Sequence, residues 1–208
     1  MASASEAAIL DGIAQAYKDK EYADLEIICA DKTWKAHKLV LCKQSDFFKK
    51  ACSGDFKEGK QNKIELPDDD KQAVDAILAF LYTHKYGDEG NSQSDTSPMS
   101  LDIRVFTIAD KYFIEPLKVY AASKFQPRTT GEWKSPEFAQ AIEELYTAGP
   151  PTDRSLRNMV LSVVRDNVDE LYGNKDQYAA FHKIISSIGD FAADVAESLA
   201  RPTSFPRT

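Results

Sequence analysis

The sequence predicts an α+β domain followed by an all-α region. Two β-rich runs lie close together at residues 25–30 and 33–37, and a helix pair, a third short strand at 63–66 and another helix follow. Beyond residue 100, only helical periodicity is visible. A composition of 43% hydrophobic and 28% charged residues is typical of a globular protein, and 208 residues suffice to bury a sizeable core.

The first expected element is a short amphipathic helix over residues 5–17. Its apolar residues recur every three or four positions and form one stripe, which consists of Ile9, Leu10, Ile13, Ala14 and Tyr17. A helix of this length is marginal in isolation. The stripe must therefore be buried, either against its own domain or against a second copy of the chain.

The strands and the next helices follow in quick succession. Asp31-Lys32 separates the first two strand runs and suits a tight turn. Residues 38–43 predict a helix, and Ser45 is a good N-cap for the helix after it, because its hydroxyl can accept a free first-turn N–H. Pro67 ends the third strand. Three aspartates then place negative charge at the start of a helix, where the helix dipole favours it.

The middle of the chain is expected to alternate helices with polar joints. Residues 87–100 contain almost no apolar side chain and predict a flexible loop. Helix resumes over 101–113, and Pro116 suits the first position of the helix that follows. A second polar joint is expected after Pro127.

A second helical block is expected at residues 132–200. Ser135-Pro136-Glu137 is a start signal for its first helix, and Asp153 is expected to cap a single helix over 154–172. One last helix carries the remaining apolar stripe, and Gly189 marks a bend in it.

The charge and hydropathy of the chain argue against two classes of partner. The formal net charge is −7, and no dense Lys/Arg run provides the basic face that nucleic-acid readers carry. No window reaches the roughly 18 apolar residues of a membrane span. Asp11 interrupts the apolar run near the N-terminus and no basic region precedes it, so no signal peptide is indicated. We expect a cytoplasmic or nuclear protein that binds neither nucleic acid nor membrane.

No residue pattern predicts catalysis, a metal site or a cofactor. The three cysteines Cys29, Cys42 and Cys52 have no C-x-x-C spacing and indicate neither a disulfide framework nor a zinc site. They are expected to be small apolar residues in a reducing compartment. The histidines His37, His84 and His182 have no Ser/Asp partner or Cys/His cluster at a plausible spacing.

The order of the motifs resembles the BTB/POZ domain family. The pieces ADLEI, WKAHKLVLCKQSDFF, DFKEG, IELPDDD, FLYTHKY and IADKYFIEPLK occur in the family's order over about residues 20–125. The later region resembles the helical C-terminal extension of stand-alone BTB proteins from filamentous fungi, through Trp133, Phe138, Leu145, Tyr146, Arg154 and Arg157. The resemblance implies a BTB/POZ domain over 1–126 and a helical extension over 132–200. Residues 201–208, at the end of the sequence, are expected to be a disordered tail.

The resemblance also implies a small three-stranded sheet capped by helices and a homodimer formed through the first helix. In the family, an Asp after that helix and a basic residue after the sequence AH meet in a charged pocket at the dimer seam, and Asp24 and Lys38 take these positions here. The alternative is a solvated pair, which contributes about 0–1 kcal/mol. The expected dimer interface consists of Ile9, Leu10, Ile13, Tyr17, Asp24 and Lys38.

A second surface is implied by Phe56-Lys57-Glu58, which resembles the hydrophobic–x–Glu pattern that many BTB adaptors dock on a cullin. An apolar anchor would enter a groove while the carboxylate accepts a hydrogen bond at its rim. Alternatively, Phe56 belongs to the core of its own domain and Glu58 is solvated. Ser97-Pro98 is likewise either a proline-directed phosphorylation site or part of an ordinary surface insertion.

These features favour a non-enzymatic protein-interaction module that binds itself as a homodimer. The first candidate function is a substrate adaptor for a cullin-RING ubiquitin ligase. Residues 132–200 or a second protein would then recruit an unknown client, because no MATH domain, propeller or zinc finger is recognisable. The second candidate is a dimeric scaffold or a transcription-regulatory partner without cullin binding. An enzyme is the weakest candidate, because no nucleophile, metal set or phosphate loop is present.

Overall fold

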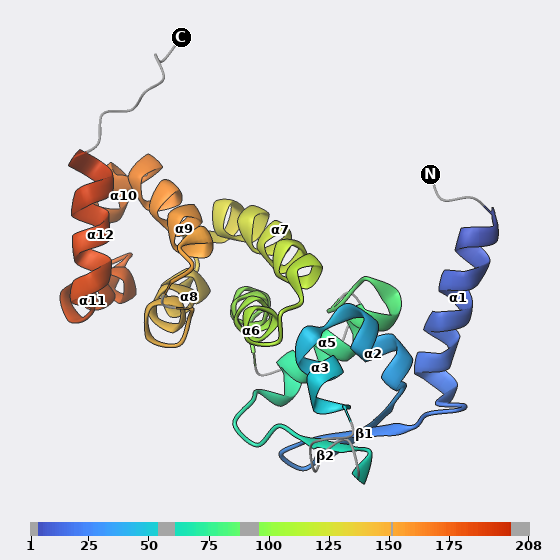
Figure 1. Cartoon of the computed structure of the whole chain (residues 1–208). Helices are drawn as coiled ribbons and strands as arrows, with labels where there is room; N and C mark the ends of the chain where they lie inside the picture. Colours follow the sequence, from blue (N-terminus) through green and yellow to red (C-terminus); the bar gives the residue numbers. More distant parts are fainter. Residues whose placement is uncertain (1–3, 54–60, 88–95, 151, 201–208) are drawn as a thin grey trace. The chain divides into compact units, whose positions relative to one another are not determined.

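The chain folds into two compact units in the computed structural model (Figure 1), which describes residues 4–53, 61–87, 96–150 and 152–200. Unit 1 contains the residues up to 95 together with 104–120, and unit 2 contains 96–103 and the residues from 121 onward. Helices α6 (Pro98–Lys111) and α7 (Glu115–Glu132) each contribute residues to both units.

Unit 1 is built on a three-stranded mixed sheet of order β2-β1-β3. The central strand β1 (Leu25–Cys29) pairs antiparallel with β2 (Lys32–Ala36) and parallel with β3 (Lys63–Glu65). Ile27 lies opposite Trp34 on one side and Ile64 on the other, and all three side chains are buried. The predicted strands are thus confirmed, and the alternation of buried and exposed residues gives the sheet one core face.

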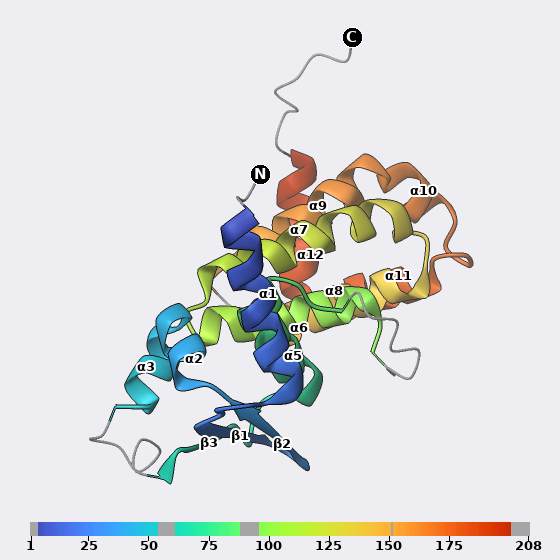
Figure 2. The same ribbon diagram turned by 90° about the vertical axis from the view of Figure 1, so that its right-hand side faces the viewer.

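Helices cover one face of this sheet (Figure 2). The helices that lie wholly in unit 1 are α1 (Ala4–Asp19), α2 (Lys38–Gln44), α3 (Asp46–Ala51) and α5 (Lys71–Thr83). Ser45 caps α3 as predicted, since its Oγ accepts the N–H of Phe48 at 3.2 Å. Asp70 caps α5 by accepting the N–H groups of Gln72 and Ala73. The predicted apolar face of α5 is buried in the core and consists of Val74, Ile77, Leu78, Leu81 and Tyr82.

Helix α6 begins at Pro98, three residues before the predicted start. Met99 and Ser100 are buried, so packing extends the helix into a stretch whose composition is that of a loop. Ser97 accepts the N–H of Ser100 through its Oγ and therefore takes the place of an N-cap. Residues 88–95, which form most of the expected loop, lie outside the described part of the chain.

The polar joint predicted after Pro127 is wrong, because α7 continues through this proline to Glu132. Proline removes one backbone donor from a helix interior and clashes with the preceding turn. Packing within unit 2 outweighs this cost. Phe125 and Thr129 are completely buried, and Arg128 Nε lies 3.0 Å from the carboxylate of the buried Asp102.

Unit 2 is all-α, as expected. After the end of α7 come α8 (Pro136–Thr147), α9 (Ser155–Asp166), α10 (Val168–Gly173), α11 (Ala179–Ser187) and α12 (Gly189–Ala200). The carboxylate of Asp153 accepts the N–H of Ser155 at 2.8 Å, which is the predicted contact at the start of α9. The tail at 201–208 lies outside the described residues.

Two predicted helices of this region are each divided in the structure. The helix expected over 154–172 breaks at Asn167, whose side-chain amide donates to the carbonyl of Val163 at 2.8 Å and so competes with the helical backbone pattern. The last helix breaks at Ile188, which has an extended backbone directly before Gly189. The bend expected at Gly189 is therefore a boundary between two helices.

Candidate protein-interaction surfaces

Helix α1 carries its predicted apolar stripe, but unit 1 covers only part of it. Ile9 is 64% exposed and Leu10 is 42% exposed, whereas Ile13 is half-buried. Tyr17 stacks on Tyr82 of α5 with 5.0 Å between the ring centroids. The C-terminal part of α1 thus packs on its own domain, and the apolar residues of the N-terminal part are exposed.

His37 has a structural role at the junction between β2 and α2. Its Nε2 lies 2.6 Å from the carbonyl oxygen of Glu21, so this nitrogen carries the proton and donates it. The hydroxyl of Tyr82 lies 2.8 Å from Nδ1, to which it donates, and 2.8 Å from the backbone N of His37, from which it accepts. Burial raises the pKa of Tyr82 to about 12, so the hydroxyl keeps its proton at neutral pH. Both ring nitrogens of His37 are therefore occupied.

Asp24 and Lys38 are linked through a helix cap. Asp24 Oδ1 accepts the backbone N–H of Lys38 at 2.8 Å, which satisfies a free donor in the first turn of α2. The ammonium of Lys38 donates to Asn62 Oδ1 at 2.5 Å. Asp24 and Asn62 also line a polar pocket of about 550 Å³, beside Tyr22, whose side chain is 92% exposed. The role of Asp24 and Lys38 in a dimer seam stays a prediction.

An exposed aromatic residue, Phe113, follows α6 and was not singled out from the sequence. Its N–H donates to the carbonyl of Asp110 at 3.2 Å, and Ile114 N–H donates to the carbonyl of Ala109 at 2.9 Å. This pair of bonds is a Schellman motif, whose left-handed position is usually glycine. Phe113 occupies that position with φ 55°, and its side chain is 68% exposed. A bulky residue at such a φ is a genuine outlier, and such outliers cluster at functional sites.

The neighbour Tyr112 holds this turn in place. Its side chain is buried, its hydroxyl donates to the carboxylate of Asp69, and burial raises the pKa of that hydroxyl. Its carbonyl accepts the Oγ–H of Ser45 at 2.7 Å. With Tyr112 fixed inward, Phe113 points outward beside a pocket of about 350 Å³ that also includes residues of α2 and α3.

The segment that holds the predicted cullin-docking residues, Phe56 and Glu58, lies outside the described residues. Helix α3, which precedes this segment, ends at Ala51, and β3, which follows it, starts at Lys63. The predicted role of the two residues stays a prediction.

Several residues behind the resemblance of the C-terminal region form one network in unit 2. Arg154 Nη2 lies 2.7 Å from Asp194 Oδ1, and the hydroxyl of Tyr146 donates to Asp194 Oδ2 at 2.7 Å. The guanidinium of Arg157 lies 4.6 Å from the centre of the Tyr146 ring. Burial alone would raise the pKa of Asp194, but the bonds from Arg154 and Tyr146 outweigh it and hold that pKa below its usual value. The network connects α8, α9 and α12.

The thiols of Cys29 and Cys52 are protonated, and the described residues form no metal-binding cluster. All three cysteines are free thiols. Burial raises the pKa of the Cys29 thiol, and it raises the pKa of the Cys52 thiol to about 12. Both thiols therefore stay protonated at neutral pH. The described residues contain no group of three or more His, Cys, Asp or Glu side chains placed to hold a metal ion. Within the same residues, no helix combines the length and apolarity that crossing a membrane requires.

Comparisons with known proteins agree on one family. The BTB/POZ domain model matches residues 13–125. TD and POZ domain-containing protein 3 of Mus musculus is 30% identical over 111 residues, which cover 53% of this chain and 28% of that protein. Kelch-like protein 41 of Mus musculus is 23% identical over 119 residues, covering 57% of this chain and 18% of that protein. The chain thus spans less than a third of the length of these relatives.

Among solved structures, the BTB domain of zebrafish PATZ1 is similar, with a TM-score of 0.45 and 17% sequence identity. The similarity covers 59% of this chain and 94% of that one.

We predict that Phe113→Gly stabilises the protein. Glycine adopts the left-handed conformation without the steric cost of a side chain, and the exposed phenyl ring loses little packing, so the free energy of unfolding should rise by about 1 kcal/mol. Urea unfolding followed by circular dichroism measures the change. Val119 in α7 is a matched control, because its side chain is 60% exposed in a regular helix. Val119→Gly should lower stability by about 0.5 kcal/mol, and a loss of stability in Phe113→Gly would show that the ring is packed.

We also predict an acid-sensitive contribution from Asp194. A carboxyl whose pKa is lower in the folded state stabilises the fold above its unfolded pKa of about 3.9. This stabilisation is lost as the pH falls through the lower folded-state pKa. Asp194→Asn should therefore flatten the decline of stability below about pH 4, measured by urea unfolding at a series of pH values. Asp190→Asn, an exposed change on the same helix, should keep the decline, and an unchanged curve in Asp194→Asn would contradict the assignment.

Proposed function

Because the chain belongs to the BTB/POZ domain family, whose domain is a non-catalytic protein-interaction module, we propose that it is a homodimeric adaptor that links a client protein to a cullin-RING ubiquitin ligase. The observation that carries the docking part of this proposal is Phe113. A phenyl ring held outward by a costly backbone conformation, beside a pocket formed with α2 and α3, offers an anchor to another protein.

Homodimerisation is supported by the open part of α1. Ile9 and Leu10 are exposed near the start of a helix whose C-terminal part packs on α5 through Tyr17. A second copy that covered them would stabilise the dimer by about 25 cal/mol for each Å² of apolar surface removed from water. The proposed interface comprises Ile9, Leu10, Ile13 and Tyr17, with Asp24 and Lys38 at its edge.

Cullin docking is the more specific part of the proposal. Phe56 and Glu58 fit the hydrophobic–x–Glu pattern of BTB adaptors in sequence. They follow α3 in the sequence, outside the described residues. An aromatic anchor and a carboxylate that accepts a hydrogen bond are the pairing expected of such an interface.

The finer organisation is also a proposal. Residues 1–126 would form the BTB/POZ domain, and residues 132–200 would form a helical extension of the kind found in stand-alone fungal BTB proteins and would recruit the client. The free thiols of the three cysteines support residence in a reducing compartment, the cytoplasm or the nucleus. A dimeric scaffold or transcription-regulatory partner without cullin binding is the alternative.

The dimer is tested by placing a charge on the open stripe. The wild-type protein should have a light-scattering mass of about twice 23.2 kDa, and Ile9→Glu should reduce it to that of a single chain, because the charge would be desolvated at the interface. Val119→Glu is the matched control, since Ile9 and Val119 are 64% and 60% exposed. A wild-type monomer, or an Ile9→Glu dimer, would rule out the assigned interface.

The adaptor role is tested by calorimetric titration with the N-terminal domain of a BTB-binding cullin. We expect micromolar or tighter binding that weakens about tenfold or more in Glu58→Ala, because a charge-assisted hydrogen bond at a docking rim is worth about 1.5–3 kcal/mol. Phe113→Gly should also weaken it, whereas Glu143→Ala, an exposed change on α8, should leave it unchanged. If no heat and no complex are observed, the alternative of a dimeric scaffold is favoured.

A further inference from the structure

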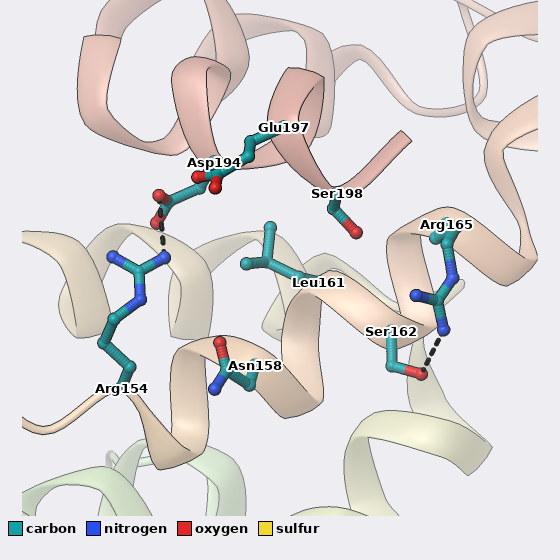
Figure 3. A pocket seen from close by; sticks show the side chains of 8 residues that line it. All are labelled: Arg154, Asn158, Leu161, Ser162, Arg165, Asp194, Glu197 and Ser198. Carbon is teal, nitrogen blue, oxygen red and sulfur yellow. Dashed lines mark hydrogen bonds and ion pairs between the residues drawn. The ribbon is translucent and has the colours of Figure 1, made fainter. Parts of the chain in front are cut away.

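Unit 2 contains an elongated groove of about 680 Å³ between α9 and α12 (Figure 3). Arg154 and Asp194 lie at one end, and Arg165 and Ser162 lie at the other. Leu161 lies between these ends and is largely buried. The volume is in the range of sites that bind small molecules or short peptide segments.

The two arginines differ in the strength of the contacts that they make. Arg154 forms an ion pair with Asp194 at 2.7 Å. Arg165 Nη2 donates a long hydrogen bond of 3.3 Å to Ser162 Oγ. Its Nε is buried without a hydrogen-bond acceptor among the described residues and forms a long ion pair with Asp166 Oδ1 at 3.6 Å. A guanidinium has five N–H donors, so the two Nη groups of Arg165 can still bind a carboxylate.

Between the ends, the groove offers polar groups without partners. Neither the side-chain amide of Asn158 nor the hydroxyl of Ser198 forms a hydrogen bond to any described residue, and both line the groove. An amide side chain has donors and an acceptor that match those of a peptide group. Asn and Ser provide adaptable polar contacts of this type in protein-binding sites.

The length of the groove fits a short extended segment. Arg154 and Arg165 lie at opposite ends of α9, and a helix rises about 1.5 Å per residue, which separates them by about 16 Å. An extended chain advances about 3.3 Å per residue. About five residues therefore span the groove.

The charges and the lining exclude other ligand classes. Asp194 and Glu197 line the groove beside the two arginines, and each arginine already forms an ion pair, so a polyanion would be repelled by two carboxylates without meeting a free cluster of positive charge. Leu161 is the one apolar residue of the lining, so the groove does not suit the apolar face of an amphipathic helix. A polar, extended segment with a single carboxylate is neither a polyanion nor an apolar helix face, so it suits this lining.

We propose that the groove between α9 and α12 binds an extended polar segment of a client protein, about five residues long, with an Asp or Glu side chain at Arg165. The proposal names the client chemistry of the adaptor described above and rests on that function. Asn158, Ser162 and Ser198 would contact the peptide backbone, and Leu161 would form the floor.

The test is a selection of fully randomised heptapeptides on the full-length protein, followed by fluorescence-polarisation titration of the enriched peptides. We expect enrichment of Asp or Glu at one fixed position. Arg165→Glu should weaken binding at least tenfold, and exchanging the peptide's acidic residue for Lys should restore binding to this variant. Lys183→Glu, an exposed charge reversal on α11 outside the groove, should leave binding unchanged.

A second variant guards against a folding defect in Arg165→Glu. Asn158 is exposed, so Asn158→Ala should retain the fold and weaken binding several-fold. If no peptide is enriched, or if the enriched peptides bind Arg165→Glu and Asn158→Ala as tightly as the wild type, the proposal is overturned. Cullin titration of the wild-type protein, run beside the peptide titration, separates the two proposals. If the wild type binds the cullin but no enriched peptide, the groove alone is refuted, and if it binds the peptide but no cullin, the adaptor alone is refuted.

Discussion

The hydrogen bond from the buried Tyr112 hydroxyl to Asp69 is the contact on which the surface of unit 1 depends. A buried hydroxyl without a partner costs about 1–3 kcal/mol, and Tyr112 also accepts a bond from Ser45, the cap of α3. Together these contacts outweigh the roughly 1–2 kcal/mol that the left-handed backbone of Phe113 costs. The packing of the Tyr112 ring in the core therefore holds the Phe113 ring outward, and the exposure of Phe113 is a consequence of the core.

A comparable division exists in unit 2. Asp194 receives Arg154 and Tyr146 and so connects three helices, which leaves that end of the groove electrically balanced. Arg165, at the other end of α9, lies 3.6 Å from Asp166 and makes one long bond to Ser162. Arg154 and Arg157, at the start of α9, thus hold the unit together, whereas Arg165 at its end makes only long contacts within the unit. The same residue type serves packing or binding according to which acceptors the fold places beside it.

Residue type and spacing in the sequence predicted the elements that depend on nearby residues alone. The cap at Ser45 and the apolar face of α5 follow from residue type and spacing, and the structure confirms both. Elements that depend on packing were predicted wrongly, since a proline usually ends a helix and yet α7 continues through Pro127. Phe113 could not have been found, because nothing in its residue type marks a left-handed position. The availability of Arg165 depends on which acceptors the folded helices bring near it.

Dimerisation and client binding would support each other energetically. A segment of about five residues covers much less than the roughly 1,200 Å² of a stable protein interface, so one groove alone would bind weakly. A homodimer formed through α1 carries two grooves, and a client with two acidic segments would bind the second at an effective concentration in the millimolar range. Avidity of this kind can exceed the affinity of either site by about 10²–10⁴ without any new contact. Weak polar recognition by the α9–α12 groove is therefore compatible with selective capture of a client, provided that the apolar stripe of α1 keeps two chains together.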